Sequence, residues 1–221
     1  MEDLVAESQL RRALENDEFV LHYQPQVDAA NGRITGAEAL LRWQHPKRGL
    51  LTPNHFIDLA EETGLIVPIG EWVLRHACAQ GRSWRVAGLP QLRLGVNLSP
   101  RQFQQPALYE TIRTILEEER FEPGRLSLEI TESVLMKNTD HAIETLVRLK
   151  QLGVHLAVDD FGTGYSSLSY VKNLPIDMLK IDRSFIMELP DIPQDMAIVS
   201  AVIAMGHSLG IEVLAEGLQT E

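Results

Sequence analysis

A chain of 221 residues, 44% of them hydrophobic and 23% charged, has the length and composition of a globular protein with a sizeable core. Its formal net charge of −11 argues against non-specific binding to DNA, RNA or an anionic membrane. No apolar run reaches the roughly eighteen residues of a membrane span, and the acidic N-terminus is not a signal peptide, so we expect neither nucleic acid nor membrane as a partner of this segment.

Cysteine usage narrows the chemistry further. Cys78 is the only cysteine, which excludes an internal disulfide and a zinc site built from cysteines. A reducing cytoplasm is the simplest location that this composition predicts. Cys78, His76 and His207 fall in predicted helices, where we expect them to be packing or surface residues.

The N-terminal part of the chain predicts a helix followed by two strands. Leu4–Glu15 has apolar residues at helical spacing, so residues 1–17 form a predicted lead-in helix. Phe19–Val27 and Ile34–Trp43 are strand-like, and the linker DAANGR between them contains an Asn-Gly turn signal. Because a parallel connection needs about a dozen residues or more, we expect an antiparallel hairpin.

The rest of the chain alternates between helical and strand-like segments. We expect helices near Pro53–Thr63, Glu71–Ala87, Ala107–Glu119, Thr139–Leu152, Ser166–Leu174 and Gln194–Leu209. Strand-like segments follow five of these helices: LRLGVNLS, LSLEITES, HLAVDD, MLKID and IEVLAEG. Gly88, Gly153 and Gly210 stand where a glycine ends a helix. Repeated units of this kind predict an α/β fold with a mostly parallel sheet, which favours a barrel and leaves an open doubly wound sheet as the alternative.

Polar side chains recur at the C-terminal ends of the predicted strands. They are Glu38, Asn97, Glu129, Asp159, Asp160, Lys180 and Glu216. Side chains alternate between the two faces of a strand, so Glu129 and Lys180 should lie opposite the aliphatic residues beside them. In barrels the active site sits at the C-terminal ends of the strands. We therefore expect these side chains to converge on one site.

The residue types of this set predict a metal site. Carboxylates and an amide oxygen are hard ligands that suit Mg²⁺ or Mn²⁺, with Ca²⁺ as an inhibitor. The five acids carry five negative charges, Lys180 returns one, and two divalent cations would return four. Two ions about 3.5–4 Å apart can activate water for attack on a phosphodiester. Lys180 would then orient the water or stabilise developing charge.

The adjacent acids Asp159 and Asp160 open a glycine loop, FGTGYSS, and this pairing has two other interpretations. An Asp-Asp pair before glycine is often only a solvated turn. A glycine loop after a strand also suggests a dinucleotide site, but here the third glycine is missing and two acids would repel a pyrophosphate. The cation-binding interpretation is favoured because polar residues recur at the same place, the C-terminal end, on the other predicted strands.

Seven motifs together resemble the EAL domain. They are Tyr23–Pro25, Glu38–Trp43, Asn97–Ser99, Leu128–Ser133, Asp159–Leu168, Leu179–Asp182 and Ala215–Gly217. The resemblance implies an α/β fold, a modified TIM (β/α)8-type barrel with an antiparallel first strand. It also implies a Mg²⁺- or Mn²⁺-dependent phosphodiesterase that hydrolyses the bacterial messenger cyclic di-GMP to 5′-pGpG. The alternative is a receptor module that binds cyclic di-GMP without cutting it.

The same resemblance assigns roles to individual residues. It implies that the metal ligands are Glu38, Asn97, Glu129, Asp159, Asp160 and Glu216. We assign Lys180, Glu216 and Glu132 to the catalytic apparatus, with Glu132 steadying the loop after Asp160. Gln24, Arg42 and Asp182 are the expected substrate contacts, although Arg42 has an ion pair with a neighbouring carboxylate as its alternative.

Organisation beyond the site is also implied by the resemblance. Residues 1–221 are expected to form a single EAL-type domain that stops before the family's eighth strand, with Gln219 in place of a family glutamate. We expect a homodimer through the loop and helix after Asp160. We also expect sensory or cyclase domains elsewhere in a longer parent protein.

Overall fold

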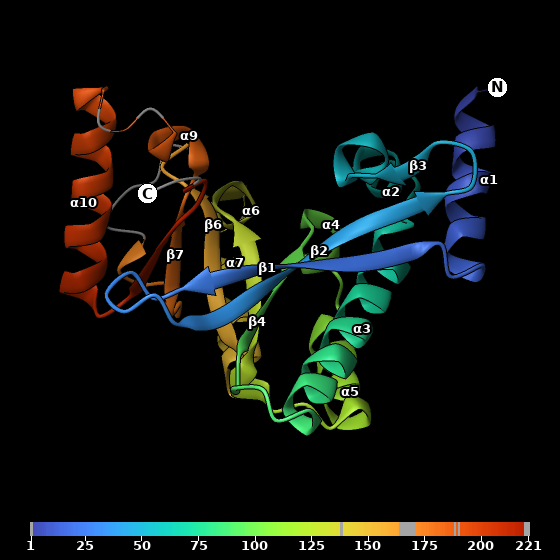
Figure 1. Ribbon diagram of the computed structural model, residues 1–221, viewed down its shortest axis with the longest axis horizontal. Helices are drawn as coiled ribbons and strands as arrows, with labels where there is room; N and C mark the ends of the chain where they lie inside the picture. Colours follow the sequence, from blue (N-terminus) through green and yellow to red (C-terminus); the bar gives the residue numbers. More distant parts are fainter. Residues whose placement is uncertain (1, 138, 164–170, 188, 190, 219–221) are drawn as a thin grey trace. The chain divides into compact units, whose positions relative to one another are not determined.

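The computed structural model describes residues 2–137, 139–163, 171–187, 189 and 191–218 (Figure 1). These residues belong to two compact units, Met1–Leu126 and Ser127–Glu221. Most of the predicted helix Ser166–Leu174, and Gln219, lie outside the described residues.

A mixed sheet forms the centre of the first unit. Its strands are β1 (Phe19–Val27), β2 (Ile34–His45), β3 (Gly49–Leu51) and β4 (Arg93–Leu98). β1 pairs antiparallel with β2, and β2 pairs in parallel with β4 on its other side. The predicted hairpin is therefore confirmed, and the first parallel pair follows it. The sequence did not predict β3, which pairs antiparallel with the end of β2.

The connection from β1 to β2 is longer than a two-residue turn. The amide of Asp28 donates to the carbonyl of Arg33, and the amide of Gly32 donates to the carbonyl of Asp28, each at 2.8 Å. Gly32 has a φ of 68°, a left-handed conformation that glycine adopts without strain. The Asn-Gly pair thus lies at the end of a loop that runs from Asp28 to Arg33.

The helices of the first unit precede β1, connect β3 to β4, and follow β4. They are α1 (Glu2–Glu15), η1 (Pro53–His55), α2 (Ile57–Thr63), α3 (Ile66–Val86), α4 (Pro100–Phe103), α5 (Leu108–Glu119) and η2 (Pro123–Arg125). α3 begins before the predicted Glu71 because Pro68 falls in its first turn, where the missing N–H costs no hydrogen bond. The sequence did not predict α4, which a capping box between Ser99 and Gln102 holds in place.

Aromatic rings fill the interior beside β1 and β2. The ring of Phe19 lies 6.1 Å from Trp43, 5.9 Å from Phe56 and 6.0 Å from Trp72, measured between centroids. Tilted rings at this separation contribute about 0.5–1.5 kcal/mol per pair beyond the burial of their area. The indole N–H of Trp43 also donates to a carboxylate oxygen of Glu18 at 2.9 Å, so this buried polar group is satisfied.

The second unit is built from parallel strands and their crossover helices. Its strands are β5 (Leu126–Thr131), β6 (His155–Phe161), β7 (Met178–Ile181) and β8 (Glu212–Ala215), paired in that order. Its described helices are α6 (Glu132–Lys137), α7 (Thr139–Gln151), α9 (Arg183–Ile186) and α10 (Pro193–Leu209). The predicted strand–helix alternation is confirmed, but α6 and α9 were not expected. Gly153 and Gly210 end their helices with φ values of 84° and 69°, as predicted.

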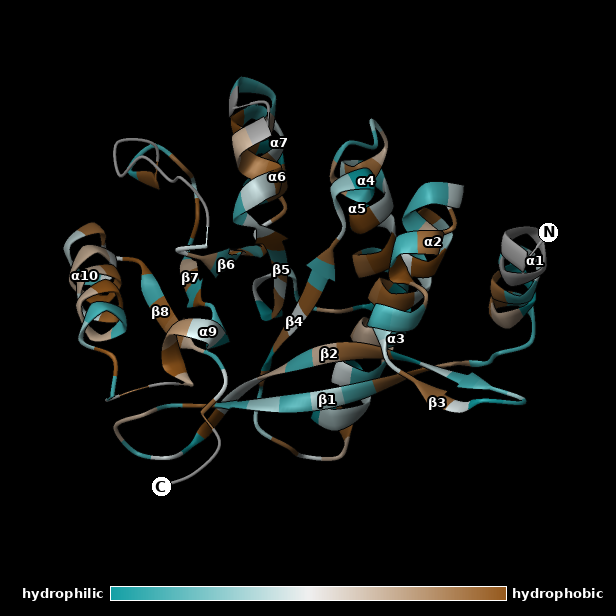
Figure 2. Ribbon diagram, turned by 90° about the horizontal axis from the view of Figure 1, so that it is seen from above, coloured by the Kyte–Doolittle hydropathy of each residue, from teal (hydrophilic) through white to brown (hydrophobic). Residues whose placement is uncertain are grey.

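Helix α10 is apolar along most of its length, as Figure 2 shows. Val202 and Gly206 are buried, whereas Met196 and Ile203 are substantially exposed. Among the described residues, no helix combines the length and the apolar character that a membrane crossing requires.

Asp177 connects the start of β6 to the helix that precedes it. Its carboxylate accepts from Nζ of Lys150, 2.8 Å from each oxygen, and from the amide of Leu156 at 2.8 Å. Its own amide donates to the carbonyl of Leu156 at 2.9 Å. One side chain thus accepts hydrogen bonds from a helix lysine and from the amide of Leu156, the second residue of β6.

Replacing Asp177 by Ala should lower the free energy of unfolding by about 1–3 kcal/mol, because the amide of Leu156 and the ammonium of Lys150 lose their acceptor. Urea unfolding followed by circular dichroism measures the change. Asp191→Ala, which removes an exposed carboxylate of the same unit, is the control and should change the value by less than about 0.5 kcal/mol. Equal costs for the two variants would contradict the role given to Asp177.

Candidate active site

A buried lysine lies at the centre of the polar interior of the second unit. Lys180, on β7, is 0% exposed. Its Nζ lies 2.5 Å from Oε2 of Glu129, 3.1 Å from Oδ2 of Asp159 and 2.7 Å from Oε1 of Glu216. The three acids come from β5, from β6 and from the residue after β8. Four of the predicted site residues therefore meet at one ammonium group.

Strand register explains this convergence. β7 pairs with β6 on one side and β8 on the other, with Ala157 opposite Met178 and Ile181 opposite Ala215. Parallel strands end at the same edge of a sheet, so polar residues near those ends come together. Glu129 is 1% exposed, and taking such a charge out of water costs on the order of several kcal/mol. The short contact with Lys180 offsets that cost.

Asp160 occupies a strained position beside this cluster. Its φ is 54°, which is uncommon for a residue with a side chain. The pairing of β6 with β7 is irregular between Val158 and Phe161, and the amide of Asp160 donates to Oδ1 of Asp159 at 2.9 Å. Burial, followed by the negative charges of Asp159 and Asp182, raises the pKa of Asp160 above its usual value.

Glu132 holds the start of the loop that follows Asp160. Its side chain is 4% exposed, and its Oε2 accepts a hydrogen bond from the amide of Gly162 at 3.0 Å. The steadying role assigned to Glu132 stays a prediction, and this hydrogen bond is the contact through which it would act. The loop residues 164–170 lie outside the described residues.

Asp182 caps the short helix α9. Its Oδ1 accepts from the amide of Ser184 at 3.0 Å and from the hydroxyl of the same residue. Partial burial alone would raise the pKa of Asp182, but the hydrogen bonds from Ser184 and the charge of Arg183 lower it below its usual value. Asp182, which the sequence predicted as a substrate contact, thus serves as a helix cap in this structure.

The first unit contains a carboxylate–amide pair of its own. Nδ2 of Asn97 on β4 donates to Oε1 of Glu38 on β2 at 2.7 Å. Gln24 on β1 is directly opposite Glu38 in the antiparallel register. Arg42 donates from Nη1 to the carbonyl of Leu41 at 2.7 Å. Glu38 and Asn97 are thus joined on neighbouring strands, but Glu38 lies in the middle of β2 (Ile34–His45) and not at its end, where the sequence had placed it.

Comparison with known proteins decides the family. Residues 7–221 match the model of the EAL domain. The chain belongs to the EAL domain family.

Relatives and solved structures of this family cover nearly the whole chain. It is 51% identical over 212 residues to the bifunctional diguanylate cyclase/cyclic di-GMP phosphodiesterase MucR of Pseudomonas aeruginosa, which covers 96% of this chain and 31% of MucR. It is 47% identical to the cyclic di-GMP phosphodiesterase NbdA of the same organism, over 99% of this chain and 28% of NbdA. The chain spans about a third of the length of these curated relatives.

A solved structure described as the PaMucR phosphodiesterase in complex with c-di-GMP superimposes with a TM-score of 0.94. It is 50% identical in sequence, and the match covers 98% of this chain and 87% of that one. The predicted fold class, an α/β modified TIM-type barrel with an antiparallel first strand, is confirmed by this likeness and by the strand pairing.

The predicted metal ligands of this EAL domain remain a prediction. Within the part of the chain that the structure describes, no three Asp, Glu, His or Cys side chains form a group suited to hold a metal ion. In the second unit the acids Glu129, Asp159 and Glu216 are arranged around Lys180.

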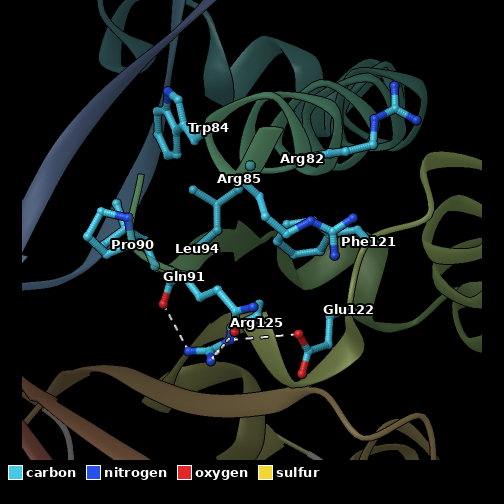
Figure 3. Close-up of a pocket in the computed structure, with 11 residues that line it drawn as sticks. Arg82, Trp84, Arg85, Pro90, Gln91, Leu94, Phe121, Glu122 and Arg125 are labelled. Atoms are coloured by element: carbon cyan, nitrogen blue, oxygen red, sulfur yellow. Dashed lines mark hydrogen bonds and ion pairs between the residues drawn. The ribbon is translucent and has the colours of Figure 1, made fainter. Parts of the chain in front are cut away.

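A pocket in the first unit is lined by none of the predicted site residues (Figure 3). It is formed by the end of α3, the start of β4 and the region of η2. Arg125 donates to the backbone oxygen of Gln91 at 2.9 Å and to its side-chain oxygen at 2.7 Å, and lies 4.0 Å from Glu122. These contacts tie together the residues at the rim of the pocket.

Replacing Lys180 by Met should lower the free energy of unfolding by about 3–5 kcal/mol, because it leaves the buried Glu129 without its cation. Glu129→Gln should also destabilise the fold. The double variant should cost about 1–3 kcal/mol less than the sum of the single variants, since both charges are removed together. Urea unfolding of the four proteins in the presence of EDTA measures this coupling, and strictly additive costs would contradict a direct ion pair.

Proposed function

We propose that this chain is a phosphodiesterase domain that hydrolyses cyclic di-GMP to linear 5′-pGpG. The observation that carries the proposal is the buried ammonium of Lys180 among three carboxylates at the strand ends. The likeness to a c-di-GMP complex of a phosphodiesterase, at 50% identity, supports it.

The reaction needs a water oxygen to bond to one phosphorus atom while the bond from phosphorus to the 3′ oxygen breaks. The 3′ oxygen leaves with a proton derived from the water, and the phosphate remains on the 5′ side as 5′-pGpG. Negative charge develops on oxygen atoms both as the new bond to phosphorus forms and as the bond to the 3′ oxygen breaks. The Nζ of Lys180 is a donor inside a site shielded from solvent, where such a charge is stabilised more strongly than in water.

The donor set fits divalent ions by its chemistry. We assign Glu129, Asp159, Asp160 and Glu216 of the second unit, with Glu38 and Asn97 of the first, as ligands, because all of them offer hard oxygens. Three carboxylates around Lys180 carry a formal charge of −3 against +1, which favours a further cation. Two Mg²⁺ or Mn²⁺ ions would lower the pKa of water and neutralise phosphate charge when bound, and Ca²⁺ would inhibit.

Substrate contacts and assembly belong to the same proposal. Gln24, Arg42 and Asp182 are proposed to contact the cyclic dinucleotide. A homodimer would form through the loop and helix after Asp160. Sensory or cyclase domains would be part of a longer parent protein, since the relatives that match are about three times as long as this chain.

The deciding experiment incubates the purified chain with cyclic di-GMP and Mn²⁺ and separates the products by chromatography. Accumulation of 5′-pGpG supports the phosphodiesterase. Retention of intact ligand on the protein would support the binding-only alternative instead. Neither product nor binding would overturn both.

Glu38→Ala should abolish turnover while leaving the fold largely intact, because it removes a proposed ligand and relieves charge repulsion without opening a cavity in the core. Product formation and thermal unfolding are measured together. Asp58→Ala, an exposed acid of the same unit, should retain the wild-type rate. Unchanged turnover in Glu38→Ala would contradict the assigned role.

Lys180→Ala should lower kcat by about a hundredfold or more while changing substrate affinity much less, because the ammonium is assigned to the transition state. Steady-state kinetics combined with equilibrium binding separates the two effects. A variant that loses affinity alone, at an unchanged kcat, would show that the lysine binds the ground state.

A further inference from the structure

The four-residue helix α9 (Arg183–Ile186) begins three residues after Lys180 and is too short to be stable by itself. Asp182 caps its first turn, and the amide of Met187 donates to the carbonyl of Arg183 at 2.9 Å. Ile186, the last residue of the helix, is buried. The turn is therefore held by its cap and by packing, and it follows directly on the C-terminal end of β7 (Figure 1).

One side of α9 packs directly on the loop after β6. A Cβ built on Gly162 would lie 3.1 Å from Cε2 and 3.5 Å from Cζ of Phe185, so the ring lies against the glycine backbone. Gly162 has a φ of 101°, which a residue with a side chain rarely adopts. Its amide is held by Glu132 at 3.0 Å. The position two residues beyond Asp160 is thus fixed between a carboxylate and an aromatic ring.

The start of α9 packs on the residue after Glu216. A Cβ built on Gly217 would lie 2.8 Å from Cβ and 3.4 Å from Cα of Arg183, and Gly217 has a φ of 82°. The amide of Glu216 donates to the carbonyl of Ile181 at 3.2 Å, and its carboxylate lies 2.7 Å from Lys180. A side chain at position 217 would displace the backbone that carries Glu216.

We infer that α9 is a positioning element for the proposed active site, with Phe185 as its key residue. The turn follows the strand of Lys180, packs on Gly162 just after β6, and packs on Gly217 beside Glu216. A displacement of about 1 Å at reacting groups can cost about a hundredfold in rate. Phe185 therefore acts through Gly162 on groups that it does not itself touch. The expected effect on kcat rests on the proposed phosphodiesterase function, whereas the positioning of Gly162 and Glu216 by α9 does not.

The test compares Phe185→Ala with Met187→Ala, which truncates a side chain that is 60% exposed just after the turn. Phe185→Ala should lower kcat for cyclic di-GMP by about ten- to a hundredfold with KM changed less than about threefold. Phe185→Leu should recover part of the loss. Met187→Ala should match the wild type.

Amide hydrogen exchange supplies a readout that does not depend on turnover. In Phe185→Ala, the amides of Gly162 and Glu216 should exchange about tenfold faster or more, while amides of β5 keep their wild-type rates. Gly217→Ala should speed exchange at Glu216 from the other side of the turn. If Phe185→Ala does not fold, the Phe185→Leu variant carries the same comparison.

Two outcomes would overturn the inference. One is exchange at Gly162 and Glu216 that is no faster in the Phe185 variants than in Met187→Ala. The other is a uniform rise across all amides, which would indicate general destabilisation. A wild-type chain without cleavage activity would refute the proposed function, and the exchange data would still decide whether α9 positions these loops.

Discussion

The contact of one ammonium group with three carboxylates is the interaction on which the polar interior of the second unit depends. Lys180 is fully buried, and a lysine in such a place is tolerated only when its charge is matched by close partners. Glu129, Asp159 and Glu216 reach it from separate strands. Because a shift of one residue would turn each side chain to the other face of its strand, this contact also depends on the register of β5, β6, β7 and β8.

Support around the charged centre is made of hydrogen bonds and close backbone packing. Glu132 holds Gly162, Asp182 caps α9, and α9 lies against both Gly162 and Gly217. The pKa values of the neighbouring acids move in opposite directions for physical reasons. Burial and nearby acids raise the pKa of Asp160. Hydrogen bonds that Ser184 donates to Asp182 lower the pKa of Asp182 despite its partial burial. These two acids of the second unit thus have pKa values shifted in opposite directions.

The hydrophobic periodicity of the sequence predicted the long helices and strands but not the short elements. The longer helices and the strands were found because their periodicity extends over many residues, and the glycines after α7 and α10 marked where those helices end. The single turns α4 and α9, the six-residue α6 and the three-residue β3 were not predicted. They have no repeating pattern and are stabilised by caps and by packing against distant residues. The predicted start of α3 at Glu71 was five residues late, because α3 begins at Ile66.

The sequence by itself determined the order of strands and helices, the antiparallel start, the family and the residues that gather near strand ends, because these depend on local periodicity and on motifs. Only the tertiary structure decided that Lys180 selects Glu129, Asp159 and Glu216 as its partners and that Asn97 pairs with Glu38. The positive φ of Asp160 and the closeness of Phe185 to Gly162 were likewise decided there. Such contacts join residues far apart in the chain, and their geometry is set by strand register and close packing, which no local pattern encodes.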